Sequence, residues 1–421
     1  MKTKAVRLYG KNDLRLEEFE LPAMKDDEII AHIISDSLCM SSYKAAIQGA
    51  NHKRVPTNVA DNPVIIGHEF CGKLVEVGKK WQHKFKSGQK FAIQPALNYQ
   101  GSLDAPGYSF PYIGGDATYI IIPNEVMEMD CLLEYKGKAF YGGSLAEPMS
   151  CIIGAFHAAY HTIQGKYMHH MGIVKNGNMA ILAGAGPMGL GAIDYALHSD
   201  RRPKLLVVTD IDKARLKRAS SIHTVDEAKK RGIELKYINT KNIENPEAYL
   251  ISITQGKRYH DVFVFAPAKE VVEQGDSILA KDGCLNFFAG PSDPEFSAML
   301  NFYNVHYAST HIVGTSGGNT QDMIESLKMM KKNLINPAAM ITHIGGLNCV
   351  VNTTLNLPKI PGNKKLIYTN IEMELTAISD FKKKGKADPL LTHLAKILEK
   401  NNGLWSAEAE NFLLNNAKSI N

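Results

Sequence analysis

A glycine-rich turn, MAILAGAGPMG at residues 179–189, decides the fold of this chain. Residues 179–183 form a short apolar strand pattern, and helical apolar spacing follows at 188–197. G-x-G-x-x-G between a strand and a helix is typical of a dinucleotide-binding turn. The first glycine allows the tight turn, the second lets the backbone approach a pyrophosphate, and the third lets helix and strand pack closely. The helix N-terminus then offers free N–H groups to the phosphates. The candidate cofactor-binding residues in this turn are Gly184, Gly186, Pro187, Met188 and Gly189.

A carboxylate follows this turn at the position that dinucleotide-binding proteins use for the ribose. Asp210 ends the next strand pattern, 205–209, and lies 21 residues after Gly189. A carboxylate there would hold the ribose 2′-OH of NAD and repel a 2′-phosphate. Arg215 belongs to a basic run that could offset this repulsion. We therefore expect NAD(H), with NADP(H) tolerated. The alternative is a plain glycine-rich turn that holds no nucleotide.

The rest of the chain shows two kinds of sequence pattern. From about residue 160, strand and helix patterns alternate, with further strands at 261–265 and 284–288. This rhythm predicts a parallel sheet wrapped by helices. Before about residue 130, short strand patterns end at glycine or proline, which is typical of a β-rich domain. These strand patterns lie at 64–67, 73–78, 91–95 and 119–123.

Length and composition set the domain count. A chain of 421 residues is too long for one ordinary core, so two domains are expected. After about residue 315 the pattern is mixed, with a helix at 320–331 and a helical C-terminal stretch. The simplest division is a β-rich domain from residues 1–159 plus 316–421, with a doubly wound α/β domain at 160–315 inserted between its two parts.

The composition excludes several classes of protein. With 44% hydrophobic and 22% charged residues, the chain is neither disordered nor collagen-like. It has no apolar stretch long enough to span a bilayer and no signal-peptide core near its N-terminus, so we expect a cytoplasmic protein with no membrane partner. The net charge of +5 is spread out, which argues against a nucleic-acid partner. No two of the six cysteines form a C-x-x-C pair, so buried thiols and one or two metal ligands are expected instead of disulfides.

Three side chains could form an open zinc site. Cys39 offers a thiolate, His68 in Gly-His-Glu offers an imidazole, and Glu147 in Ala-Glu-Pro offers a carboxylate. Such a set leaves a fourth position for water or a substrate oxygen. Spacing alone does not select this reading, because distant ligands have no fixed sequence separation and isolated Cys and His residues are usually packed in a core.

The motifs stand in the order of the zinc-dependent medium-chain dehydrogenases, and the chain resembles that family. The motifs are Gly-His-Glu-Phe at 67–70, Cys39 with Ser41 two residues later, Ala-Glu-Pro at 146–148 and the glycine fingerprint. Further stretches resemble the L-sorbose-1-phosphate reductase group of this family, at 52–56, 91–97, 208–212, 361–369 and 403–410. The resemblance implies a GroES-like β-rich catalytic domain with an inserted Rossmann domain. It also implies a zinc-dependent oxidoreductase that interconverts L-sorbose 1-phosphate and D-glucitol 6-phosphate with a nicotinamide cofactor.

The resemblance also implies roles for individual side chains. It makes Cys39, His68 and Glu147 the ligands of one catalytic zinc, with Glu69 as a carboxylate that enters or leaves the coordination sphere. Ser41 would pass on the hydroxyl proton of the substrate.

Three positions depart from the pattern of many relatives. Lys44 stands where these relatives place a proton-relaying histidine, so it would act only with a lowered pKa. Cys151 lies near the third ligand of the Cys-His-Cys alcohol dehydrogenases, and we rank Glu147 ahead of it. No cysteine lies at 95–115, where many relatives have four, so we expect no structural zinc.

The phosphate of a substrate requires cationic partners, and Lys53 and Arg54 supply the right chemistry. An exposed basic loop without a ligand is an equal alternative. An unphosphorylated polyol or another secondary alcohol is the alternative substrate, and a cofactor-binding protein without catalysis is the alternative function. Relatives associate through the cofactor domain, so the resemblance implies a homo-oligomer, either a dimer or a tetramer.

Overall fold

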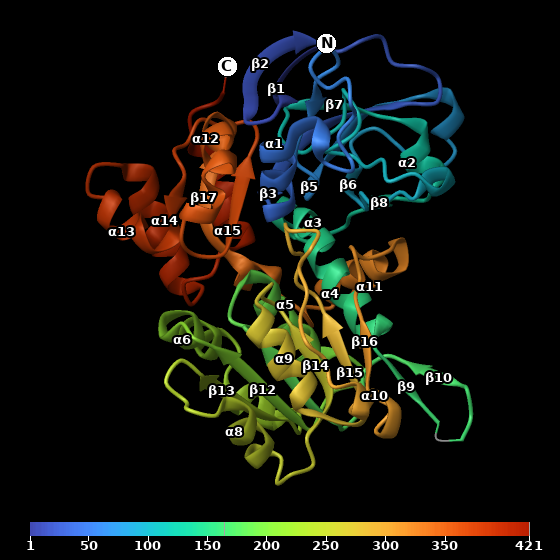
Figure 1. Ribbon diagram of the computed structural model, residues 1–421. Coiled ribbons are helices and arrows are strands. Elements are labelled where there is room, and N and C mark those ends of the chain that lie inside the picture. Colours follow the sequence, from blue (N-terminus) through green and yellow to red (C-terminus); the bar gives the residue numbers. More distant parts are fainter. Residues whose placement is uncertain (164, 421) are drawn as a thin grey trace. The chain divides into compact units, whose positions relative to one another are not determined.

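Strands β11 to β16 form a six-stranded parallel sheet in the computed structural model, which describes residues 1–163 and 165–420 (Figure 1). Their order is β13-β12-β11-β14-β15-β16, which is the doubly wound order of dinucleotide-binding sheets. The predicted parallel sheet is therefore confirmed. The strands are β11 (Asn178–Leu182), β12 (Leu205–Asp210), β13 (Glu234–Asn239), β14 (Tyr259–Val264), β15 (Leu279–Phe287) and β16 (His311–Val313).

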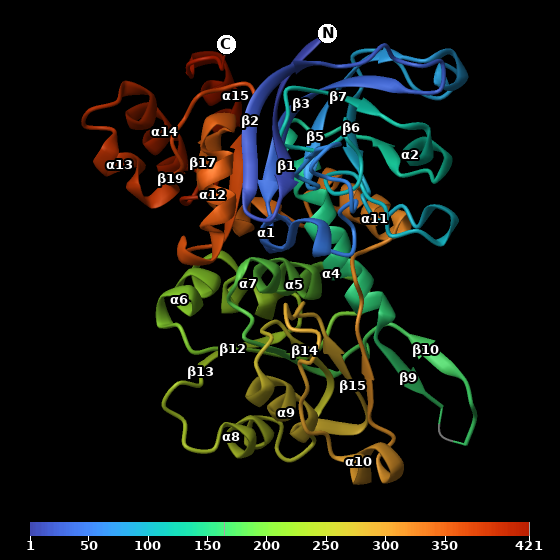
Figure 2. The same ribbon diagram turned by 45° about the horizontal axis from the view of Figure 1, so that its top comes forward.

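Helices cover both faces of this sheet. Figure 2 shows α5, α6 and α7 on one side of the strands and α8 and α9 on the other. The helices are α5 (Pro187–His198), α6 (Lys213–Ile222), α7 (Val225–Lys230), α8 (Pro246–Ile253), α9 (Lys269–Ser277) and α10 (Phe302–Tyr307). Because helices cover both faces, the inner strands read as continuous apolar runs, and every residue of β11 and β12 is buried. A hairpin of β9 (Tyr160–Thr162) and β10 (His169–Met171) precedes the sheet.

A larger sheet with order β19-β17-β18-β3-β5-β6-β8 organises the β-rich unit, with β7 paired to β3. A three-stranded sheet, β2-β1-β4, belongs to the same unit. The strands are β1 (Lys2–Gly10), β2 (Asp13–Glu20), β3 (Ile29–Leu38), β4 (Val64–Ile65), β5 (Phe70–Val77), β6 (Lys90–Ile93), β7 (Tyr119–Ile122), β8 (Leu132–Glu134), β17 (Ile341–Gly346), β18 (Lys364–Tyr368) and β19 (Thr376–Ala377). The sequence patterns did not predict β1, β2 and β3. In β1 and β2, outward-facing charged side chains interrupt the apolar residues, so no apolar run marks the strand.

Short helices and a helical C-terminal stretch complete this unit. Figure 1 shows α13, α14 and α15 grouped beside β17. The helices are α1 (Met40–Gln48), α2 (Asn124–Glu128), α3 (Phe140–Ser144), α11 (Thr320–Lys331), α12 (Val350–Leu355), α13 (Phe381–Lys384), α14 (Pro389–Lys400) and α15 (Ala407–Asn416). The predicted helix at 320–331 and the helical C-terminal stretch are both present.

The two compact units divide slightly differently from the prediction. The first unit comprises Met1–Pro148, Asn319–Lys332 and Met340–Asn421, and the second comprises Met149–Gly318 and Asn333–Ala339. The predicted boundaries at 159/160 and 315/316 therefore move to 148/149 and 318/319. The first shift arises because helix α4 (Ala146–Ala158) runs through the boundary. A continuous helix shows no change of sequence pattern at the point where one unit ends and the next begins. Among the described residues, no helix is both long and apolar enough to cross a membrane.

Candidate functional site

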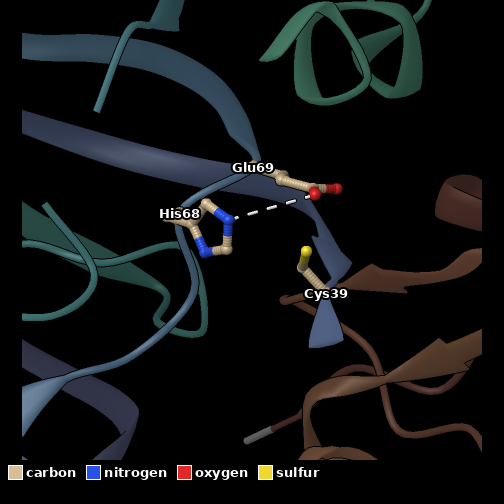
Figure 3. A group of neighbouring side chains, drawn as sticks. All are labelled: Cys39, His68 and Glu69. Carbon is tan, nitrogen blue, oxygen red and sulfur yellow. Dashed lines mark ion pairs between the residues drawn. The ribbon is translucent and has the colours of Figure 1, made fainter. Parts of the chain in front are cut away.

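Three potential metal ligands meet in the first unit. Cys39 joins β3 to α1, and His68 and Glu69 lie in the turn between β4 and β5. One ligand atom of each lies within 4.8 Å of one ligand atom of the other two. Figure 3 shows the sulfur, the imidazole and the carboxylate facing one another, with 4.0 Å between His68 Nε2 and Glu69 Oε1. His68 and Glu69 are buried and Cys39 is half-buried.

The turn that carries His68 and Glu69 is held by hydrogen bonds to β3. Gly67 has a φ of +91°, a conformation that favours glycine. The amide of Glu69 donates to Asp36 Oδ1 at 3.2 Å, and the amide of Ser37 donates to the carbonyl of Glu69 at 3.0 Å. Strand β3 therefore positions both Cys39 and the His-Glu turn.

The imidazole of His68 has a hydroxyl partner on each side. Tyr108 Oη lies 3.0 Å and Ser42 Oγ lies 3.2 Å from Nδ1, and Ser41 Oγ lies 3.3 Å from Nε2. Burial lowers the pKa of His68, so the ring is neutral and keeps a lone pair for a metal. Ser41 also donates to Cys39 Sγ at 3.1 Å. The predicted proton-passing serine thus contacts two of the predicted zinc ligands.

Glu147 lies in the first turn of α4, where it is buried beside this group but is not one of the three converging residues. Burial raises the pKa of Glu147, and the charges of Glu69 and Cys39 act in the same direction while His68 opposes them. Cys151, the alternative third ligand, lies one helical turn later and belongs to the second unit.

A lysine that the sequence analysis did not predict completes the site. Lys364, the first residue of β18, donates to Glu69 Oε1 from a buried position. The other carboxylate oxygen, Oε2, is buried and lacks a hydrogen-bond partner within the described part of the chain. A buried anionic oxygen without a partner, beside a thiol and a neutral imidazole, fits a bound divalent cation. The donor chemistry therefore suits zinc.

Basic side chains gather next to the metal ligands. Burial lowers the pKa of His52 to about 4, and the positive charges of Arg54, Lys53 and Lys44 add to the effect. The Arg54 guanidinium lies 5.5 Å from the centroid of the Tyr108 ring. Its Nε is buried and makes no hydrogen bond to any described residue. Lys53 is exposed, and burial lowers the pKa of half-buried Lys44.

The nucleotide turn of the second unit has the predicted strand–turn–helix form. Gly186 precedes α5, Pro187 and Met188 begin it, and no described side chain caps this helix start. A Cβ on Gly189 would lie 2.0 Å from the carbonyl oxygen of Gly184, so only glycine allows this close packing. A Cβ on Gly186 would meet nothing within 4 Å, which leaves the approach to the backbone open. The free N–H groups at this helix start suit a pyrophosphate.

Asp210 is buried at the end of β12 and braces the nucleotide turn. Its Oδ2 accepts from the amide of Ala185 at 3.1 Å, and its Oδ1 accepts from the amide of Asp212 at 2.9 Å. Arg215 on α6 lies with its Nε 3.7 Å from Asp212 Oδ2. Arg218, from the same basic run, donates to the carbonyl of Ala339.

A second group of potential metal ligands lies in the second unit and consists of His161, Asp282 and His311. The two ring nitrogens of His161 face Asp261 Oδ1 at 3.0 Å and the carbonyl of Asp282 at 2.8 Å. Those of His311 face the carbonyls of Ser309 and Tyr160 at 2.8 and 2.6 Å. Each of these ring nitrogens thus already has an acceptor at hydrogen-bond distance within the protein, so this group is not our candidate metal centre.

Sequence reasoning missed Lys364 and Tyr108. Lys364 stands in the pattern Lys-Lys-Leu-Ile-Tyr at 364–368, and a lysine inside an apolar strand pattern is the one signal that could have indicated a buried pair. Tyr108 lies in a loop without a motif, so its contact with His68 had no sequence signal.

Known proteins are similar to this chain in sequence and in fold. Residues 25–130 match the alcohol dehydrogenase GroES-like domain, and residues 187–332 match the zinc-binding dehydrogenase family. The chain is 51% identical over 418 residues to the L-sorbose 1-phosphate reductase of Klebsiella pneumoniae, covering 99% of this chain and 98% of that protein. It is 52% identical over 412 residues to the mannitol-1-phosphate 5-dehydrogenase of Aliivibrio fischeri, covering 98% of this chain and 97% of that protein. The crystal structure of the 2R,3R-butanediol dehydrogenase of Bacillus subtilis shares the fold, with a TM-score of 0.69 and 19% identity over 87% of this chain and 100% of that one.

Proposed function

Because this chain belongs to the zinc-binding dehydrogenases with a GroES-like domain, we propose that it transfers a hydride between a nicotinamide cofactor and a sugar or polyol phosphate. The reaction is of the type that interconverts L-sorbose 1-phosphate and D-glucitol 6-phosphate. Two relatives, 51% and 52% identical to this chain, carry names that refer to phosphorylated sugars or polyols. These names support this substrate class.

One observation carries the proposal: a single side chain joins the basic cluster to the metal ligands. Tyr108 contacts His68 through its hydroxyl at 3.0 Å and lies under the guanidinium of Arg54. A phosphate held by Arg54 would therefore lie close to a metal held by His68. Arginine suits this role because its planar fork binds two phosphate oxygens at once. Lys53 and Lys44 add positive charge around the same group.

Cys39, His68 and a carboxylate would hold about one zinc ion per chain. Glu147 is our first choice for the carboxylate, and Glu69 would be a neighbouring carboxylate able to enter or leave the coordination sphere. Zinc, when bound, supplies a Lewis acid that favours loss of the proton from the substrate hydroxyl. Ser41 would accept that proton, since its hydroxyl already contacts Cys39 and His68. Lys44 is suited to receive it next, because burial lowers its pKa.

A nicotinamide cofactor supplies the hydride chemistry when bound, and this chain contributes its binding and orientation. The turn from Gly184 to Gly189 would hold the pyrophosphate on the N-terminus of α5. Asp210 would hold the adenosine ribose, which favours NAD(H) over NADP(H). Arg215 is the cation nearest in sequence that could receive a 2′-phosphate, and its contact with Asp212 competes with that role.

The second unit would also form the contact between two copies of the chain. Strand β16 is an edge of the six-stranded sheet, and helix α10 exposes Phe302, Tyr303 and Tyr307. A strand edge that pairs with no further described strand, next to exposed aromatic side chains, favours a second copy of the same chain. A dimer measured by light scattering, and lost on replacing Phe302 and Tyr307 with aspartate, would support this contact.

No disulfide joins any of the six cysteines, all of which are described, in keeping with the cytoplasm as the place of action.

A substrate panel tests the proposed activity. L-Sorbose 1-phosphate, mannitol 1-phosphate, sorbitol and mannitol are each supplied with the appropriate form of NAD or NADP, and nicotinamide absorbance is followed. We expect turnover of the phosphorylated compounds, at much higher kcat/KM than of the free polyols. Turnover of free polyols alone would contradict the proposed substrate class.

A variant of Arg54 tests the phosphate contact. In Arg54→Gln, KM for the phosphorylated substrate should rise about tenfold or more, because hydrogen bonds to charged groups contribute about 1.5–3 kcal/mol. KM for a free polyol should change little. Arg15→Gln, which removes an exposed guanidinium paired with Asp13, is the matched control. An equal effect of Arg54→Gln on both kinds of substrate would contradict a phosphate clamp.

A further inference from the structure

A buried carboxylate from the C-terminal helix reaches the start of a helix far away in the sequence. Glu410 on α15 is 3% exposed. Its Oε1 accepts from the amide of Phe140 at 2.6 Å, and its Oε2 accepts from the amide of Tyr141 at 2.9 Å. These two amides are the first two of helix α3, and 270 positions separate Phe140 from Glu410.

Glu410 therefore performs the capping role that a neighbouring side chain usually performs. The first amides of a helix have no partner inside the helix and require an acceptor. The residue before α3 is Ala139, which has no acceptor side chain. A carboxylate here also interacts favourably with the positive end of the helix dipole. The position of α3 thus depends on a residue of the C-terminal helix.

Helix α3 leads directly to a proposed metal ligand. Its last residue, Ser144, donates to the carbonyl of Ser35 at 2.9 Å, and the two serine hydroxyls lie 2.6 Å apart. Ser35 belongs to β3, the strand that ends one residue before Cys39. After Leu145, α4 begins with Glu147 as its second residue. Contacts at both ends of α3 therefore set the backbone position of Glu147.

The same carboxylate also accepts a hydrogen bond from the strand that carries Lys364. Tyr368, the last residue of β18, donates its hydroxyl to Glu410 Oε2 at 2.9 Å. The Tyr368 hydroxyl accepts from Trp405 Nε1 at 2.7 Å, and Trp405 is 1% exposed. Lys364, at the other end of β18, pairs with Glu69. The C-terminal helix thus contacts β18, which carries Lys364, and α3, which leads into the helix that carries Glu147.

We propose that Glu410 is a positioning residue for the metal centre: by capping α3 it sets the place of Glu147 relative to Cys39 and His68. The proposal rests on the proposed function, in which Glu147 is a zinc ligand. Residues beyond 332 lie outside the two matched family models, so this support comes from a part of the chain that those two models do not include. The C-terminal stretch is thereby part of the metal centre's framework.

Zinc affinity in Glu410→Gln tests the proposal. Glutamine keeps the shape but has only one acceptor atom, so one of the two α3 amides faces a donor. We expect zinc, measured by competition with a chelator, to bind about tenfold more weakly. The absorption bands of the cobalt-substituted protein should shift, because the ligand geometry changes. Glu408→Gln, an exposed carboxylate on the same helix, is the matched control and should leave both readouts unchanged.

Two further measurements separate positioning from simple stabilisation. Loss of fold stability alone would lower the unfolding temperature of Glu410→Gln without changing zinc affinity or the cobalt spectrum of the folded protein, and that result would overturn the proposal. If Glu410→Gln does not fold, Tyr368→Phe decides the matter, since it removes one donor to the carboxylate and should weaken zinc binding to a smaller degree. Unchanged zinc affinity in Tyr368→Phe would then overturn it.

The wild-type protein distinguishes this failure from failure of the proposed function. A wild-type chain that binds no zinc contradicts both proposals. A wild-type chain that binds zinc, with Glu410→Gln indistinguishable from it, contradicts only the role of Glu410.

Discussion

Lys364 and Glu69 form a buried ion pair between residues 295 positions apart in the chain. Burial alone would lower the pKa of Lys364, but the nearby Cys39, Glu69 and Glu147 raise it, so the ammonium stays charged. The pair balances part of the negative charge that a thiolate and two carboxylates bring to the metal site. It also occupies only one oxygen of Glu69, which leaves the other available.

Replacement of Lys364 by methionine should destabilise the metal-free protein. The substitution leaves a buried carboxylate without its partner, and breaking such a pair costs about 3–5 kcal/mol. Urea unfolding followed by fluorescence measures the loss. Lys364→Arg keeps the charge and should recover part of the stability, and Lys79→Met removes an exposed lysine as a control. If Lys364→Met were as stable as the Lys79→Met control, the ion pair would have no structural role.

The Tyr108 hydroxyl should matter for turnover more than for substrate binding. In Tyr108→Phe, His68 loses a partner of Nδ1 while the ring under Arg54 remains. Outer partners of metal ligands affect activity by about 10–100-fold, so we expect kcat to fall by about tenfold. KM for the phosphorylated substrate should stay near the wild-type value. Steady-state kinetics measures both quantities.

Two companion variants make the Tyr108 result specific. Tyr108→Leu also removes the ring beneath Arg54 and should raise KM as well as lower kcat. Tyr112→Phe changes a tyrosine that packs in a different apolar cluster and should have no effect. A Tyr108→Phe variant that changed KM alone would contradict the assigned contact with His68.

Asp210 should control the choice between NADH and NADPH. In Asp210→Asn the carboxylate charge that repels a 2′-phosphate is absent, and a charged hydrogen bond to the ribose is weakened. The ratio of kcat/KM with NADPH to that with NADH should rise on the order of tenfold. The ratio is the right measure because Asp210 also accepts from Ala185, so both KM values rise when the turn loosens. Asp226→Asn, an exposed carboxylate on α7, is the control, and an unchanged ratio in Asp210→Asn would contradict the ribose contact.

His161 should make the stability of the second unit depend on pH. Burial alone would lower the pKa of His161, but the hydrogen bond and charge of Asp261, with the carbonyl and carboxylate of Asp282, raise it above 6.5. A raised folded-state pKa means that this contribution is complete below pH 6.5 and is lost as the pH rises through the folded-state value. The ring of His311, 5.9 Å away, and His260 are further titratable groups that interact with it.

Denaturant unfolding near pH 6 and near pH 8 measures the effect, since the unfolded histidine titrates at about 6.5. The free energy of unfolding of the wild type should exceed that of His161→Gln by more at the lower pH than at the higher one. A difference for His161→Gln that grew with pH would mean that His161 is buried in its neutral form.

Sequence alone predicted those features whose residues lie close together along the chain. The nucleotide turn lies within one strand–turn–helix, so Gly184, Gly189 and Asp210 could be recognised from spacing, and the parallel sheet, the family resemblance and the fold class are confirmed. Strands β1 and β2 were not predicted because outward-facing charged side chains interrupt their apolar residues.

The tertiary structure decided which distant side chains share one buried space. Sequence offered Cys39, His68 and Glu147 as a possible zinc set, which only the family resemblance selected, and the structure brings Glu69 within 4.8 Å of the first two. The partners Lys364, Tyr108 and Glu410 had no predicted role. Hydrophobic periodicity reports how each segment faces the core, whereas a buried charge requires a partner from whichever segment packs against it. That partner is set by strand order and helix placement, which no local pattern records.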